Sequence, residues 1–199
     1  MSRRLFVLAV ALVAALLVVP AAFALRVHVR VEGKTQTIFG STEPALNVQA
    51  NALDALESAS LAGEFYYHVQ SASFGRYVDQ IGRYAAAGSS GWVFKVNGVS
   101  PAVGADAVQL KDGDHVLWYW ADFGPKGGPK TLQLRAGPKR NCYRVVAQDD
   151  TGKTTAARGA RLHVGGRSVL ARTGSACIGK HAGLVTATLA GAVRSNALR

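Results

Sequence analysis

Apolar and polar residues alternate most regularly in the stretch 25–32, LRVHVRVE. The apolar set, Leu25, Val27, Val29 and Val31, occupies every second position, as on one side of a β-strand. The pattern predicts an amphipathic strand with one buried face. The polar set is expected to face water on the other side: Arg26, His28, Arg30 and Glu32.

The stretch 91–120 contains all three tryptophans and predicts two strands that share an aromatic core. Alternation places one set of large side chains on a common face: Trp92, Phe94, Val96, Val116, Trp118 and Trp120. Asn97-Gly98 directly follows the first of these strands. This dipeptide favours the positive φ angles of a tight type I′ turn.

A single helix is predicted over residues 51–60. Asn51 is placed to cap it, and Asp54 stands three residues later, as in a capping box. Leu53 and Leu56 lie at helical spacing, and Gly63 is a plausible C-terminal stop. Further strands are predicted around the helix, at 35–39, 64–70 and 74–82.

Charge divides the chain sharply into two halves. Residues 25–124 carry a net charge of −3, whereas residues 125–199 carry +12. The Gly- and Pro-rich segment 125–129 lies at this change, and such composition resists both helix and strand. The sequence therefore predicts a linker at 125–129 and a second domain at 130–199. Short strands without a helix signal indicate a β-sandwich there.

The order of motifs in the first half resembles the transcobalamin-type C-terminal domain, a β-grasp-like module of exported bacterial proteins. The resemblance rests on the helix at 51–57, on WVFKVNG at 92–98, on Gly104-Ala105-Asp106, and on LKDGD at 110–114 before the aromatic strand. It covers about residues 25–123. Residues 159–187 are similar, more loosely, to bacterial Ig-like or carboxypeptidase-regulatory-like modules.

These resemblances imply the fold class. It is α+β, with a β-grasp-like domain at 25–124, in which one helix packs on a mixed sheet, and a small all-β sandwich at 130–199. In cobalamin carriers the related domain caps one side of the corrin ring, and a large helical domain, absent from this chain, closes the other.

A retained capping surface would lie at the Asn97-Gly98 turn. The candidate ligand-binding residues are Asn97, Gly98, Ser100 and Tyr119, and Tyr119 is expected to be exposed on the face opposite the tryptophans. The alternative is that Asn97-Gly98 only turns the chain and that the tryptophans only fill the core. Both interpretations remain open on the sequence.

The N-terminus indicates export. Arg3-Arg4 precedes the apolar run 5–19, and Ala22-Phe23-Ala24 forms a small-x-small cleavage motif, so residues 1–24 are predicted to be a signal peptide. The run is shorter than the roughly 20 residues of a membrane span. The mature protein is expected to be secreted or associated with the cell envelope. Membrane contact would follow only if the segment stayed uncleaved.

The two cysteines, Cys142 and Cys177, form an even pair in an exported chain, which predicts a disulfide. Their spacing does not suit zinc, because there is no C-x-x-C and no histidine stands at ligand spacing from either one. No metal site or cofactor is predicted.

The motif inventory favours binding over catalysis. There is no G-x-S-x-G, no H-E-x-x-H and no glycine-rich phosphate loop, so no catalytic residue is predicted, although a site assembled only in space would escape this test. The leading hypothesis is a non-catalytic binding or envelope-associated protein whose basic half contacts anionic polymers. The alternative is a carrier of a small flat ligand such as cobalamin. Nucleic acid is not expected as a partner.

Overall fold

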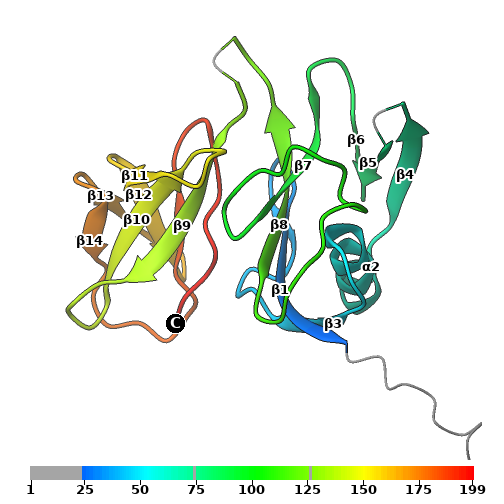
Figure 1. The fold of residues 1–199 in the computed structure, drawn as a ribbon. Helices are drawn as coiled ribbons and strands as arrows, with labels where there is room; N and C mark the ends of the chain where they lie inside the picture. Colours follow the sequence, from blue (N-terminus) through cyan, green and yellow to red (C-terminus); the bar gives the residue numbers. More distant parts are fainter. Residues whose placement is uncertain (1–23, 74, 126) are drawn as a thin grey trace, which may run out of the picture.

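The computed structural model describes residues 24–73, 75–125 and 127–199 (Figure 1). The segment that carries the predicted signal peptide lies almost wholly outside these residues. The elements in chain order are β1 (Leu25–Glu32), β2 (Thr37–Phe39), β3 (Ala45–Val48), α2 (Ala52–Gly63), β4 (Tyr67–Ala72), β5 (Gly75–Ile81), β6 (Tyr84–Ala85), β7 (Ser90–Val96), β8 (His115–Asp122), β9 (Lys130–Ala136), β10 (Cys142–Gln148), β11 (Thr154–Ala156), β12 (Ala160–Val164), β13 (Arg167–Ala171), β14 (Ser175–Cys177), β15 (Thr186–Thr188) and β16 (Ala192–Val193).

The first sheet has the strand order β2-β1-β8-β7, and β3 pairs with β1 at its other end. β1 runs parallel to β8, so that Val29 lies beside Val116 and Val31 beside Trp118. These side chains are buried in one core, as the alternation of β1 predicted for its apolar residues. A separate small sheet, β4-β5-β6, lies next to this core.

The helix α2 covers the apolar face of the first sheet. The predicted capping box is confirmed, because the Asn51 side chain accepts hydrogen bonds from the backbone N–H groups of Leu53 and Asp54, and the Asp54 side chain accepts one from the backbone of Asn51. The helix ends at Gly63, with Glu64 in a left-handed conformation at φ 51°. Its buried residues are Ala52, Leu53, Ala55, Leu56 and Ala59.

The second half contains two further sheets. One has the order β11-β10-β9-β16, with β14 paired to β10, and the other has the order β13-β12-β15. They enclose a separate core that includes Leu132, Leu134, Val145 and Leu162. Figure 1 shows this half, in yellow to red, on the side of β1 and β8 opposite α2.

The predicted fold class, an α+β chain with a β-grasp-like first domain, is wrong. Strands make up 51% of the structure, one helix accompanies several sheets, and the arrangement is of the β-sandwich type. The physical reason is that α2 covers only one face of one sheet. The opposite face packs against the second half, where Val193 of β16 meets Tyr119 and Ala121 of β8.

The predicted wet face of β1 is also wrong at two of its four positions. Arg30 is 3% exposed and Glu32 is 0% exposed. Arg194 of the second half donates from Nε to Glu32 at 3.1 Å, and its backbone oxygen accepts from Arg30 at 3.0 Å. These charges are therefore buried because a segment more than 160 residues away covers them.

Candidate functional site

A cleft of about 390 Å³ runs along the outer edge of β7. We call it the aromatic cleft. Its walls come from β5, β7, β8 and the loop 100–105, and residue Asp150 reaches it from the second half. The aromatic lining residues are Tyr77, Trp92, Phe94, Trp118, Tyr119 and Phe123.

The rings behind the cleft are held in fixed orientations. Phe94 and Trp118 stack at 4.9 Å between ring centroids, and Trp92 meets Trp120 edge-on at 5.7 Å. The indole of Trp92 donates to the backbone oxygen of Tyr84 at 2.8 Å, and that of Trp118 donates to Ala52 at 3.3 Å. Satisfied indole N–H groups and ring contacts make these walls rigid.

The backbone of β7 also faces the cleft. The backbone N–H of Asn97 donates to the His115 oxygen, and that of Phe123 donates to the Ser89 oxygen. These two bonds show that the odd-numbered residues of β7 direct their backbone groups toward β8. The N–H and C=O groups of Trp92 and Phe94 therefore point away from β8. Among the described residues no strand pairs with this stretch of β7, so its edge can hydrogen-bond a ligand.

The Asn97-Gly98 turn connects β7 to the loop 100–105 that lines the cleft. Its φ angles are 50° and 84°, which confirms the predicted turn geometry. Val96 and Val99 exchange backbone hydrogen bonds of 2.9 and 3.0 Å across it, which sends the chain back along the outer edge of β7. Gly98 lies against the side chain of Gln148. A Cβ atom at position 98 would be only 2.1 Å from the Gln148 side-chain nitrogen, so a larger residue would clash there.

One end of the cleft is polar and is built from both halves. The Ser100 hydroxyl donates to Asp150 Oδ1 at 3.1 Å, and the Ser100 N–H donates to the Asp150 backbone oxygen at 2.9 Å. The buried ammonium of Lys95 lies 3.3 Å from Asp150 Oδ1. It also donates to the backbone oxygen of Asp149 at 2.9 Å.

Burial changes the titration of two groups at this end. Burial raises the pKa of Tyr119 to about 12, and the negative charge of Asp150 adds to the rise. Burial lowers the pKa of Lys95, although Asp150 opposes that shift. The phenol of Tyr119 is therefore protonated at neutral pH, and the Asp150 carboxylate lies 3.3 Å from the Lys95 nitrogen.

The four predicted ligand residues separate into two places. Ser100 and Tyr119 line the aromatic cleft, whereas Asn97 and Gly98 line a different cavity of about 250 Å³ between the halves. The expectation that Tyr119 is exposed is wrong, because only 2% of it is accessible. The reason is that its face of β8 packs on Val193.

Sequence reasoning missed Arg76, Val103, Phe123 and Asp150 as cleft residues. They come from four separate segments, and no local pattern links them. Val103 and Phe123 are unusually exposed for apolar side chains, at 56% and 44%, but this signal of a binding surface is visible only in the folded chain.

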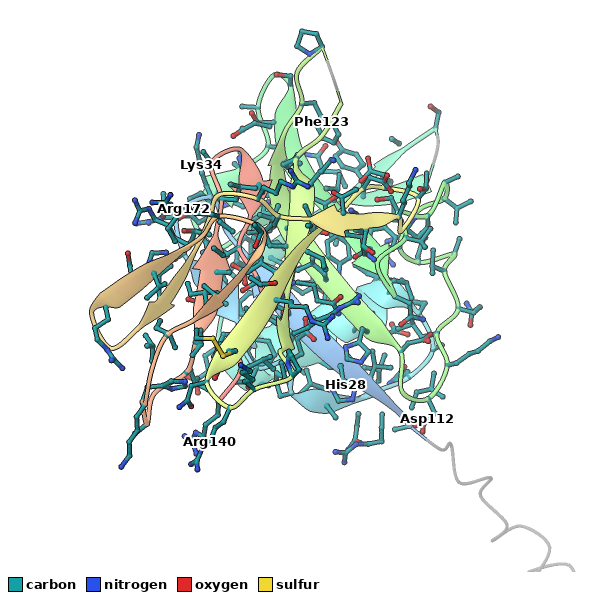
Figure 2. The ribbon with its side chains drawn as sticks, turned by 90° about the vertical axis from the view of Figure 1, so that its left-hand side faces the viewer. His28, Lys34, Asp112, Phe123, Arg140 and Arg172 are labelled. Atoms are coloured by element: carbon teal, nitrogen blue, oxygen red, sulfur yellow. A yellow bond between two sulfur atoms is a disulfide. The ribbon has the colours of Figure 1, made fainter. Side chains whose placement is uncertain are left out.

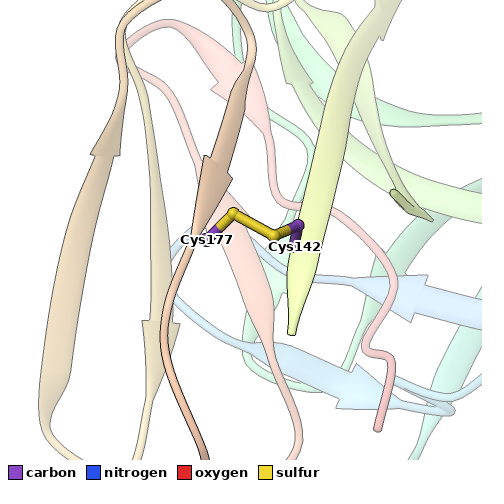
Figure 3. The surroundings of a disulfide bond; sticks show 2 residues. All are labelled: Cys142 and Cys177. Atoms are coloured by element: carbon purple, nitrogen blue, oxygen red, sulfur yellow. A yellow bond between two sulfur atoms is a disulfide. The ribbon is translucent and has the colours of Figure 1, made fainter. Parts of the chain in front are cut away.

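In the second half, Cys142 and Cys177 form a disulfide between β10 and β14 (Figure 3). The two cysteines are directly opposite in the pairing of these strands. Asp149 and Asp150 directly follow the far end of β10, away from the disulfide, and both carboxylates already accept hydrogen bonds. Asp149 accepts from the hydroxyl and the N–H of Thr151, which lowers its pKa.

Comparison with known proteins gives one family. Residues 49–122 match the model of a domain of unknown function, DUF4430. This family is transcobalamin-like, so the resemblance is supported for that part of the first half. No curated protein matches the chain.

Solved structures with partial similarity to this chain include a protein from Ruminococcus gnavus described as a "putative metal binding protein", with 18% identity and a TM-score of 0.38 over 49% of this chain and 97% of that one. Within residues 24–73, 75–125 and 127–199, no group of three His, Cys, Asp or Glu residues could hold a metal ion. None of the helices in these ranges has the length and hydrophobicity to cross a membrane.

Proposed function

We propose that this chain is an exported, non-catalytic binding protein that holds a small, flat, mainly apolar ligand in the aromatic cleft. The observation that carries the proposal is the combination of rigid aromatic walls with an unpaired strand edge in one cavity of about 390 Å³. Small-molecule sites typically combine an apolar lining with a few fixed polar groups, in a volume of about 300–1,000 Å³.

The polar groups of the cleft support recognition of a ligand with hydrogen-bonding groups on one edge. The β7 backbone offers both donors and acceptors at Trp92 and Phe94. The Tyr119 phenol and the Asp150 carboxylate lie at the polar end. An intact corrinoid is larger than this cavity, so only an edge of such a molecule could enter, and a smaller planar compound fits better.

The same groups support a non-catalytic role. A general base needs a pKa near the working pH and a free position to accept a proton. Asp150 is bonded to Ser100 and lies beside Lys95, and Tyr119 has a pKa of about 12. These arrangements favour holding a ligand over transferring its protons.

The export signal and the charge of the second half support a location outside the cytoplasm. The predicted signal peptide at 1–24 leads into the described chain, and the disulfide Cys142–Cys177 suits an oxidising compartment. The basic second half would favour contact with anionic envelope polymers.

The test is isothermal titration calorimetry of residues 25–199 with cobalamin, protoporphyrin and riboflavin as probes of planar ligands. In the variant Ala102→Trp an indole on the exposed cleft loop fills the cavity without changing the core. The matched control is Ala62→Trp, on the exposed last turn of α2. Binding that Ala102→Trp abolishes and Ala62→Trp preserves supports the cleft. Binding that survives Ala102→Trp, or no binding by any planar probe, contradicts it.

A further inference from the structure

The β9–β10 hairpin carries four cationic side chains within ten residues: Arg135, Lys139, Arg140 and Arg144. We call it the basic hairpin. All four residues are exposed, and Lys139 and Arg140 line a polar cavity of about 430 Å³ together with His181 and Arg199. Figure 2 shows Arg140 at the end of the second half opposite Arg172.

No acidic side chain of the second half lies near these cations along the sequence. The acidic residues of 125–199 are Asp149 and Asp150 alone, at the far end of β10. The seven residues of β10 place them about 20 Å from Cys142. Across the described parts of the chain, no ion pair involves the four cations of the basic hairpin.

The pairing of β9 with β10 increases the repulsion between these charges. Arg135 and Arg144 are directly opposite each other in the register. Like charges at directly opposite positions destabilise a sheet unless another group neutralises them. Arg135 is also oriented, since its guanidinium donates to Gln133 Oε1 at 2.9 and 2.7 Å. The arrangement favours a bound anion.

The tip of the hairpin is rigid before any ligand arrives. The Cys142–Cys177 disulfide ties β10 to β14. Gly137 donates to Cys142 at 2.8 Å, Cys142 donates to Lys139 at 3.1 Å, and Ile178 donates to Asn141 at 2.9 Å, all through the backbone. Preorganised charges lose less conformational freedom on binding, which strengthens the complex.

We infer that the basic hairpin is a binding site for a linear phosphodiester polymer that carries no bases, such as a chain of glycerol phosphate units. Guanidinium groups match the geometry of phosphate oxygens. Recognition rests mainly on charge, because Tyr143, the one Phe, Tyr or Trp side chain lining the cavity, is 5% exposed and offers no ring to stack on a sugar or a base. The imidazole of His181, which also lines the cavity, is already hydrogen-bonded to the Tyr143 hydroxyl and to the backbone oxygen of Gly183. A polyuronate or a nucleic acid would need such a platform for selectivity.

The experiment measures the affinity of the mature chain for poly(glycerol phosphate), for polygalacturonate and for a single-stranded DNA oligonucleotide over a range of salt concentrations. The test variant is Lys139→Gln/Arg140→Gln/Arg144→Gln. The matched control is Lys153→Gln/Arg158→Gln/Arg172→Gln. It also removes one lysine and two arginines, but from exposed positions away from the hairpin.

The test variant is expected to bind poly(glycerol phosphate) at least about tenfold more weakly than wild type, since each lost contact is a charged hydrogen bond. The slope of log affinity against log salt should fall by about 2, for three phosphate contacts at about 0.7 each. The control should keep most of the affinity.

Three results would overturn the inference: equal losses in both variants, an affinity for polygalacturonate equal to that for poly(glycerol phosphate), or tighter binding of DNA. Unchanged binding by the test variant would do the same. None of the four cations of the basic hairpin lines the aromatic cleft, so small-ligand binding does not depend on these charges and the two proposals can fail separately.

Discussion

Replacing Glu32 with glutamine tests whether the buried charges between the halves stabilise the chain. The Glu32 carboxylate is fully buried and accepts hydrogen bonds from Thr37 at 3.0 Å and from Arg194 Nε at 3.1 Å. Arg30 lies 3.6 Å away. Glu32→Gln keeps the shape of the side chain but leaves two guanidinium groups without this anion.

The expected loss follows from those contacts. Removing one partner of a buried ion pair costs about 3–5 kcal/mol. The lower end applies here, because Arg30 keeps Glu43 at 3.2 Å and Arg194 keeps the Gly33 oxygen at 2.7 Å. A loss of about 3 kcal/mol lowers the urea midpoint by about 1.5 M for a slope of about 2 kcal/mol/M.

The assay is equilibrium urea unfolding of wild type and variant, followed by tryptophan fluorescence and by far-UV circular dichroism. The control is Glu57→Gln on the exposed side of α2, whose carboxylate accepts one bond from Tyr67 at 2.7 Å. It should cost less than about 1 kcal/mol. A loss below about 1 kcal/mol for Glu32→Gln would refute the reasoning.

Three further predictions concern local features. Burial raises the pKa of the folded Tyr119 phenol to about 12, from its ordinary value of 10.0. The free energy of unfolding should therefore be full below pH 10 and fall by about 2–3 kcal/mol toward pH 12. Tyr119→Phe should flatten that decline in a pH series of urea midpoints. Asn51→Ala should cost about 1 kcal/mol by thermal unfolding, because the N–H groups of Leu53 and Asp54 lose their acceptor, and an unchanged melting temperature would argue against the cap. Cys142→Ser/Cys177→Ser should cost about 2–5 kcal/mol, since the bridge spans 35 residues of sequence, and a stability equal to wild type would show that the bridge constrains nothing.

Local features were predictable because their causes lie within a few residues. Alternation gave the bounds of β1, and the pair Asn51 and Asp54 gave the start of α2. Asn97-Gly98 adopts positive φ at both positions, as its composition requires.

Features that depend on distant segments were not predictable. Arg30 and Glu32 alternate as exposed residues do, and only Arg194 explains their burial. Tyr119 was expected to be exposed because it alternates with the tryptophans of β8. It is buried because β16, a distant segment, packs on its face of the strand. The fold class failed because the pattern cannot say which surface covers the second face of the first sheet.

The aromatic cleft was only partly predictable. Its tryptophan walls follow from the pattern of β7 and β8, and Ser100 and Tyr119 were among the candidates. Asp150 comes from the other half of the chain and meets Ser100 through an isolated contact between Val99 and Thr151. No periodicity connects positions 50 residues apart.

The most direct measurement of the proposed function is a ¹H–¹⁵N spectrum of the three indole N–H groups during titration with the planar probe that binds most tightly. Trp92 and Trp118 line the aromatic cleft, whereas Trp120 lines another cavity near the linker. The Trp92 and Trp118 signals are expected to move with the probe concentration, and the Trp120 signal is expected to move less. Movement of Trp120 alone, or of none of the three at saturation, would contradict it.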